Sequence, residues 1–156
     1  NEKIMVARTL SKSYALAGLR FGFLVAQPQV IAQLMKVKDS YNCDSLSISG
    51  ATAAIGDQAW LAENRSRILA SRERMQRALA SIGFSIVESH ANFVWCTHSS
   101  QPLKPVYEKL KENYLLVRYM NYPSWGDGLR ISVGTDEQID ACMALLKETM
   151  NDGTNG

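Results

Sequence analysis

The chain has 156 residues, 46% hydrophobic and 21% charged, which leaves room for a hydrophobic core and excludes disordered, collagen-like and coiled-coil chains. Seventeen Lys and Arg against fifteen Asp and Glu give a net charge of +2, so we expect neither nucleic acid nor a membrane as a partner. Three cysteines without a CxxC pair and two histidines argue against a disulfide framework and a metal site, and they favour a reducing compartment.

The first part of the chain, residues 1–60, predicts too few strands for a sheet of its own. Short apolar, β-branched runs predict buried strands, and Pro28 suits the first turn of a helix. The elements expected are strands at 4–10 and 21–25, a polar break at 11–14 between them, and helices at 28–40 and 47–61. Because the first apolar run begins almost at once and the chain has no initial Met, we expect a piece of a longer protein.

Residues 61–150 predict a long helix followed by a small α+β unit. Apolar residues recur at three- and four-residue steps from 61 to 82, and Gly83 ends that helix. The elements that follow are strands at 84–87, 92–97, 115–119 and 129–133, and helices at 102–113 and 136–150. Thr135 is expected to cap the last helix, with Gln138 at capping-box spacing, and the polar tail 151–156 is expected to be flexible.

Lys12 carries the chemistry that the sequence suggests, because it directly follows the first predicted strand. At the inner end of a buried strand an ammonium group is poorly solvated, which lowers its pKa and allows the amine to form a Schiff base with a carbonyl. Arg20, Thr9, Ser11 and Ser13 supply a cation and hydroxyl groups that could hold a phosphate. A lysine beside a phosphate-binding cluster suits pyridoxal phosphate. The other interpretation is a solvated lysine and a surface arginine, because these residue types are common.

The run S-K-S-Y-A-L-A-G-L-R-F-G resembles the cofactor-lysine segment of fold-type I aminotransferases, in particular the histidinol-phosphate aminotransferase group. In that family the lysine, here Lys12, forms the Schiff base with pyridoxal 5'-phosphate and moves the proton between substrate and cofactor. The resemblance implies that Arg20 binds the cofactor phosphate, that Ser11 assists, and that Thr9 is a further phosphate-binding hydroxyl. It also implies close backbone packing at Gly18.

Two later segments resemble the same family. The run G-L-R-I-S-V-G implies that Arg130 binds the carboxylate or phosphate of the substrate, and Arg118 stands near a second phosphate-binding arginine of the histidinol-phosphate enzymes. From the residues alone, a strand arginine paired with a surface acid is the more common case for both. The S-H-A-N-F segment at 89–93 resembles a family segment that we interpret as mainly architectural.

The resemblance implies an α/β fold, PLP-dependent transferase fold type I, with residues 1–60 as the C-terminal part of the large cofactor domain. Residues 61–150 would then be the linking helix and small C-terminal α+β domain. The family's D-x-A-Y stretch, whose aspartate faces the pyridine nitrogen, is absent from this sequence. We therefore expect the C-terminal portion of the enzyme, and the isolated piece is expected to be inactive.

The function expected from this resemblance is transfer of an amino group between an amino acid or amino alcohol phosphate, such as histidinol phosphate, and 2-oxoglutarate. The partners are a small-molecule amino donor and a 2-oxo acid. A cytoplasmic homodimer in histidine biosynthesis is the family expectation. The alternatives are a threonine-phosphate decarboxylase-type enzyme and a catalytically inert fragment.

Other features favour structural roles. The five arginines between 65 and 77 are diluted by glutamates and predict a solvated helix face, because no aromatic residue is interleaved for base stacking. Strand-edge or loop positions are expected for His90 and His98, and packing for Cys96 and Cys142. Tyr122 and Trp125 lie in a predicted loop that leads to Arg130, where packing or shaping of the substrate entrance are the two interpretations.

Overall fold

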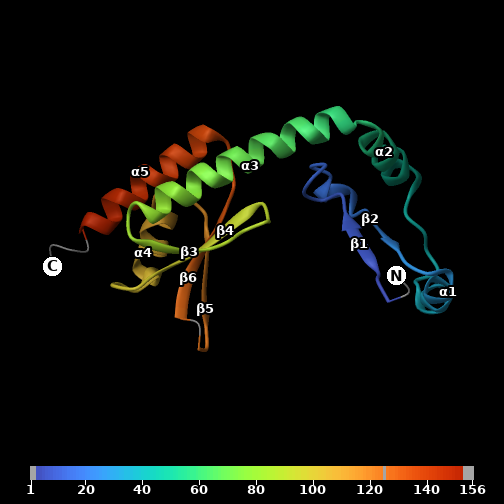
Figure 1. Ribbon diagram of the computed structural model, residues 1–156, viewed down its shortest axis with the longest axis horizontal. Coiled ribbons are helices and arrows are strands. Elements are labelled where there is room, and N and C mark those ends of the chain that lie inside the picture. The colour runs from blue at the N-terminus through green and yellow to red at the C-terminus, as the bar shows by residue number, and fades with distance from the viewer. Residues whose placement is uncertain (1–2, 125, 153–156) are drawn as a thin grey trace. The chain divides into compact units, whose positions relative to one another are not determined.

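The computed structural model describes residues 3–124 and 126–152 (Figure 1). Contacts divide the chain into two units, and the division falls after Arg65 within helix α3 (Gln58–Ala80). Each unit is described by itself. The assignment of residues 1–60 and 61–150 to a cofactor domain and a small domain stays a prediction.

The first unit contains one antiparallel strand pair and two short helices. Strand β1 pairs with β2 in a register that places Val6 opposite Val25. The elements are β1 (Val6–Thr9), the 3₁₀ helix η1 (Ala17–Leu19), β2 (Gly22–Val25), α1 (Pro28–Val37) and α2 (Ser45–Gly56), followed by the start of α3. Gly22 is required at the strand pair, because a Cβ there would lie 2.7 Å from the carbonyl oxygen of Arg8.

The prediction that these two strands are buried is wrong for the described residues. Every residue of β1 and β2 is exposed, and Val25 keeps 58% of its surface accessible. The described part of the first unit leaves both faces of the ladder uncovered, although most of the side chains are apolar. The sequence pattern identified the apolar side chains correctly. It could not show that no helix or sheet of the described residues packs on them.

The second unit is a four-stranded antiparallel sheet with helices on one face. The strand order is β3-β4-β6-β5, so sequence neighbours β4 and β5 are separated by β6. The elements are the rest of α3, then β3 (Phe84–Val87), β4 (Phe93–His98), α4 (Leu103–Glu112), β5 (Arg118–Tyr122), β6 (Gly126–Ser132) and α5 (Asp136–Asp152). Figure 1 shows α3 and α5 running side by side along this unit.

Alternation along the strands separates the core from an open sheet face. On β4, Val94 and Cys96 are buried while Phe93 and Trp95 point to the other side. The buried side chains of the three helices pack on the first of these faces, and packing predicted for Cys96 and Cys142 is confirmed. The core consists of Met75, Leu79, Phe84, Val94, Cys96, Leu103, Val106, Leu110, Leu129, Ile131, Ile139, Cys142, Met143, Leu146 and Met150.

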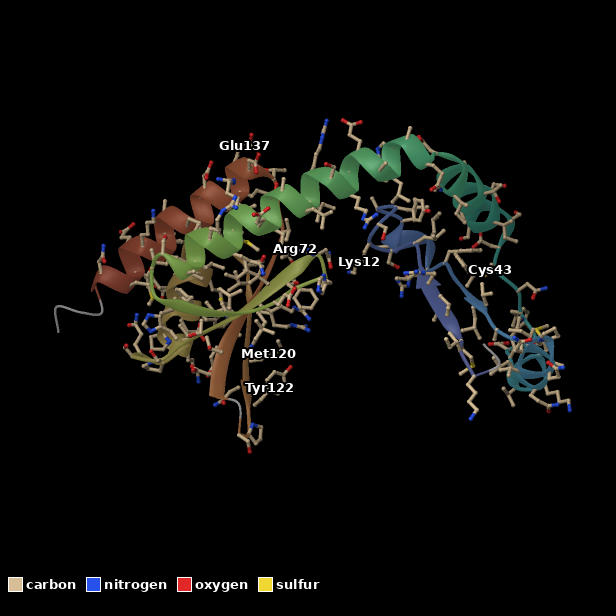
Figure 2. The ribbon with its side chains drawn as sticks, in the orientation of Figure 1. Lys12, Cys43, Arg72, Met120, Tyr122 and Glu137 are labelled. Carbon is tan, nitrogen blue, oxygen red and sulfur yellow. The ribbon has the colours of Figure 1, made fainter. Side chains whose placement is uncertain are left out.

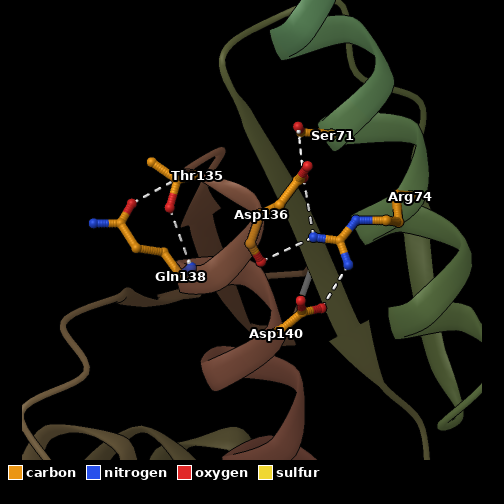
Figure 3. A network of polar contacts seen from close by, with 6 residues as sticks. All are labelled: Ser71, Arg74, Thr135, Asp136, Gln138 and Asp140. Carbon is orange, nitrogen blue, oxygen red and sulfur yellow. Dashed lines mark hydrogen bonds and ion pairs between the residues drawn. The ribbon is translucent and has the colours of Figure 1, made fainter.

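A polar network joins α3 to the start of α5 (Figure 3). Arg74 forms ion pairs with Asp136, at 3.1 Å, and with Asp140, and these carboxylates raise the pKa of the guanidinium. The solvated helix face predicted for the arginines is wrong at Arg72, which is half-buried and donates to a backbone carbonyl, whereas Arg74 keeps 39% of its side chain exposed in its ion pairs. These two side chains face neighbouring elements of the unit, a fact that their spacing did not reveal.

The predicted capping box of the last helix is confirmed. The Gln138 N–H donates to Thr135 Oγ1 at 3.3 Å, and the Thr135 N–H donates to Gln138 Oε1 at 3.0 Å (Figure 3). The strand predicted at 115–119 lies three residues later, at Arg118–Tyr122. The tail predicted at 151–156 is helical through Asp152, and its last four residues lie outside the described residues. In the described ranges, no helix combines the length and the apolar character that a membrane crossing demands.

Candidate functional site

A loop from Leu10 to Phe21 connects β1 to β2 and carries the lysine segment. The Leu10 N–H donates to the Phe21 carbonyl at 3.2 Å, and the Leu16 N–H donates to the Leu10 carbonyl at 3.1 Å. Leu10 itself is buried, with 1% of its surface exposed. These bonds close the loop on itself, so Lys12 and Arg20 are held in one local structure.

The hydroxyl groups at the start of this loop bind each other. Thr9 Oγ1 donates to Ser11 Oγ at 2.9 Å, and the Ser11 N–H donates to Thr9 Oγ1 at 3.2 Å. Thr9 and Ser11 are therefore brought together immediately before Lys12, as the sequence predicts for a hydroxyl cluster. With the Thr9 proton donated to Ser11, the pair can present the Ser11 O–H to an oxyanion.

Lys12 lies in the turn that follows, where its carbonyl accepts the N–H of Ala15 at 3.0 Å (Figure 2). The poorly solvated environment that the sequence predicts for this lysine is not found, because the side chain is exposed within the first unit. The expectation depended on a buried β1, and β1 is uncovered in the described residues. Within residues 3–124 and 126–152, the amine has no hydrogen-bond or ion-pair partner of its own.

Arg20 ends the 3₁₀ helix in the left-handed conformation, with φ 51° and ψ 36°. Its Nη1 donates to the Ala17 carbonyl at 2.8 Å, which leaves most of the guanidinium donors available. A non-glycine residue in this conformation is uncommon and is held by its surroundings. The close packing implied at Gly18 is not found among the described residues, because a Cβ there would meet no described atom within 4 Å.

The start of α2 fixes the backbone beside Arg20, a contact that the sequence analysis missed. The Ser47 hydroxyl lies 2.6 Å from Asp44 Oδ2 and 3.2 Å from the Leu19 carbonyl oxygen, so two acceptors share one proton. The Ser47 N–H also donates to Asp44 Oδ1 at 2.8 Å. The hydrogen bonds from the Ser47 side chain and backbone lower the pKa of Asp44. The signal was present in the sequence, since Asp44 precedes a helical stretch as an N-cap residue does.

The second group of predicted site residues lies on the open face of the other unit. Arg118 on β5 and Arg130 on β6 are directly opposite each other, and Trp95 on β4 is opposite Arg130 on its other side. Directly opposite residues of an antiparallel pair place their side chains on the same face. Two cations and an indole therefore share a strip of this sheet, an arrangement that can bind an anion with an apolar group.

Two further side chains extend this strip along β5. Tyr122 packs against Trp95 with 5.9 Å between ring centroids, and its hydroxyl lies 2.9 Å from the sulfur of Met120 (Figure 2). The Trp95 ring packs so closely over Gly128 that a Cβ there would overlap it. Packing is thus confirmed for Tyr122, while Trp125 lies outside the described residues.

The donor set of the first loop fits pyridoxal phosphate. A primary amine, a guanidinium and one hydroxyl belong to the closed loop, and the Thr9 hydroxyl at the end of β1 adjoins it; this set matches the aldehyde and the dianionic phosphate of that molecule. A metal centre has no comparable support, because no group of three His, Cys, Asp or Glu side chains in the described ranges could hold an ion.

Comparison with known proteins identifies related chains. The chain matches the family described as aminotransferase class I and II over residues 1–146. It is 57% identical over 150 residues to a histidinol-phosphate aminotransferase of Rhodopirellula baltica, and the match covers 96% of this chain and 41% of that protein. It is 44% identical over 151 residues to histidinol-phosphate aminotransferase 1 of Bradyrhizobium diazoefficiens, with 95% of this chain and 43% of that protein covered.

Solved structures share the fold. The histidinol-phosphate aminotransferase of Sinorhizobium meliloti, in complex with pyridoxal-5'-phosphate, superposes with a TM-score of 0.86 at 26% identity, over 97% of this chain and 42% of that one. The histidinol-phosphate aminotransferase of Clostridium acetobutylicum gives a TM-score of 0.81 at 25% identity, over 95% and 46%. The chain thus spans 41% to 46% of the length of these four relatives.

Proposed function

Because the chain belongs to the class I and II aminotransferases, we propose that it is part of a pyridoxal-phosphate-dependent aminotransferase whose amino donor carries an anionic group. Histidinol phosphate is the candidate donor, since the two sequence relatives described above carry that name, and 2-oxoglutarate is the candidate acceptor. The observation that carries the proposal is that one loop, closed by backbone hydrogen bonds, bears both the Lys12 amine and the Arg20 guanidinium.

Four residues would hold the cofactor: Lys12, Arg20, Thr9 and Ser11. The guanidinium of Arg20 offers several donors in one plane, which suits two phosphate oxygens at once. The hydroxyl pair of Thr9 and Ser11 adds a donor at the other end of the loop. When bound, pyridoxal phosphate supplies an aldehyde that reacts with amines and a ring that withdraws electrons from the substrate carbon.

Lys12 would act both as the attachment point and as the acid and base of the reaction. A primary amine can accept a proton at Nζ from the substrate carbon and return it at a neighbouring atom. Proton transfer in both directions is efficient only when the pKa of the amine is near the working pH. The exposed position of Lys12 therefore leads us to propose that the whole protein covers this loop and excludes water from the amine.

Arg130, assisted by Arg118, would bind the anionic group of the substrate. Neither guanidinium has a carboxylate partner in the described part of the chain, so the N–H donors of both arginines are available to an oxyanion. A planar guanidinium can donate hydrogen bonds to either a carboxylate or a phosphate, which suits an enzyme with two different substrates. A decarboxylase remains the alternative activity on this fold, and the aminotransferase names of the sequence relatives favour transamination.

The setting of the enzyme is also a proposal. Three cysteines are free, two of them buried, which supports a reducing compartment such as the cytoplasm. The exposed apolar residues of β1 and β2 support further coverage of the first unit, in the rest of a longer chain or in a homodimer.

A spectroscopic experiment on the whole protein tests this proposal. Addition of pyridoxal phosphate is expected to give a visible absorption band, and borohydride reduction followed by peptide mapping is expected to place the added mass on Lys12. Lys12→Ala should abolish both signals, and Lys3→Ala is the matched control that should keep them. An unchanged spectrum would refute the assignment and support an inert fold. A label on another lysine would refute the assignment of Lys12.

A further inference from the structure

The ring of Phe93 lies beneath the guanidinium of Arg130. The distance from the guanidinium carbon to the ring centroid is 5.1 Å, within the range of a cation–π contact. Phe93 is diagonal to Arg130 across the β4–β6 ladder, because the residue directly opposite Arg130 is Trp95. Both side chains are half-buried, so the ring limits where the guanidinium can move.

The S-H-A-N-F segment fixes the backbone at Phe93. The Ser89 hydroxyl donates to the Phe93 carbonyl and accepts the N–H of Ala91 at 3.2 Å. From α3, Arg72 Nη1 donates to the Ala91 carbonyl at 2.8 Å. Three hydrogen bonds therefore hold the turn immediately before Phe93.

The same segment is tied to the strand that carries Arg130. The Val133 N–H, just after the end of β6, donates to the Asn92 carbonyl at 2.9 Å. On the other side of the arginine, the Trp95 ring is pressed against Gly128. The guanidinium thus contacts the Phe93 ring, while the ring of Trp95, the residue opposite Arg130, is occupied by its packing on Gly128.

We propose that Phe93 is a positioning residue, whose ring, held by segment 89–93, orients the Arg130 guanidinium toward an oxyanion. This inference rests on the proposed function, because it concerns the anionic group of the substrate. On this proposal the S-H-A-N-F segment contributes to anion binding, in place of the mainly architectural role predicted from the sequence.

Binding of inorganic phosphate to the whole protein is measured by titration calorimetry. The binding heat that remains in Arg130→Met is due to phosphate bound at other cations. Phe93→Leu is expected to raise the dissociation constant by about 3- to 10-fold, as loss of a partly exposed cation–π contact does. KM for the anionic donor should rise by a similar factor while kcat changes by less than about twofold. Phe93→Tyr keeps the ring face and is expected to restore both values.

Tyr107→Leu is the matched control, because it breaks the stacked pair with Tyr119 on the helical side of the sheet. It is expected to lower thermal stability and to leave phosphate affinity unchanged. Equal losses of affinity in Tyr107→Leu and Phe93→Leu would overturn the proposal, and so would a further loss when Phe93→Leu is added to Arg130→Met. The titration needs no activity: if phosphate affinity falls as expected but pyridoxal phosphate does not bind, only the proposed function fails.

Discussion

Arg118 and Arg130 face each other across the β5–β6 ladder, and neither has an acidic partner among residues 3–124 and 126–152. Like charges directly opposite each other destabilise a strand pair. An oxyanion that binds between them would remove that repulsion. The arrangement therefore links the stability of the sheet to the presence of an anion.

Arg118→Gln is expected to stabilise the protein in phosphate-free buffer, by about 0.2–1 kcal/mol, because it removes the repulsion across the ladder. It should also reduce the increase in Tm that phosphate produces, because one of the two cations is lost. Differential scanning calorimetry with and without phosphate measures both effects. Lys104→Gln removes the same charge from α4 and should change neither value. A lower Tm for Arg118→Gln without phosphate would contradict this account.

Arg20→Met is expected to weaken binding of pyridoxal phosphate by about 10- to 100-fold, the effect of losing charge-assisted hydrogen bonds. Arg20→Lys should lose less, because it keeps the charge but not the planar set of donors. An absorption titration of the whole protein gives the affinities. Arg8→Met, on exposed β1, is the charge-matched control, and an equal loss there would show that only net charge matters.

Asp44 is expected to make the first unit sensitive to acid. Hydrogen bonds from Ser47 place the pKa of its carboxyl below the ordinary value of 3.8. A lowered folded-state pKa means that the stabilisation is complete above pH 3.8 and disappears as the pH falls through the folded-state value. Asp44→Asn should keep the cap and lose this part of the acid sensitivity, whereas Asp44→Ala should lose both. Unfolding curves between neutral and acidic pH measure the difference, and parallel pH profiles for wild type and Asp44→Asn would disprove it.

The cysteines are expected to differ strongly in reactivity. Burial raises the pKa of Cys96 to about 12 and that of Cys142 to about 11, while Cys43 is exposed. A thiolate is the reactive form, so a thiol reagent at neutral pH should modify Cys43 rapidly and the other two only after unfolding. Cys43→Ser should remove one fast-reacting thiol per chain, and Cys142→Ala should remove none. A fast phase that survives in Cys43→Ser and disappears in Cys142→Ala would contradict the burial.

Local patterns were sufficient for most elements of the second unit. Alternation on β4 separated Val94 and Cys96 from the open face, and the capping box at Thr135 marked the first turn of α5. Strand β5 was displaced by three residues, because Leu115 and Val117 pack against the core without joining the ladder, while Leu116 between them is exposed. The sequence pattern identifies which side chains are apolar. Hydrogen bonding to a neighbouring strand decides which of these residues belong to a strand.

By itself, the sequence determined the chemical inventory: an amine at Lys12 with hydroxyls beside it, and guanidiniums at Arg20, Arg118 and Arg130. The tertiary structure decided how these groups are held, because hydrogen bonds and ring contacts join residues that are far apart in the chain. Ser47 reaches the carbonyl beside Arg20, and Phe93 lies under Arg130, neither of which any spacing in the sequence encodes. Exposure was likewise decided by the tertiary structure. The apolar residues of β1 can be read from its own sequence, but whether they are buried depends on other segments packing on them.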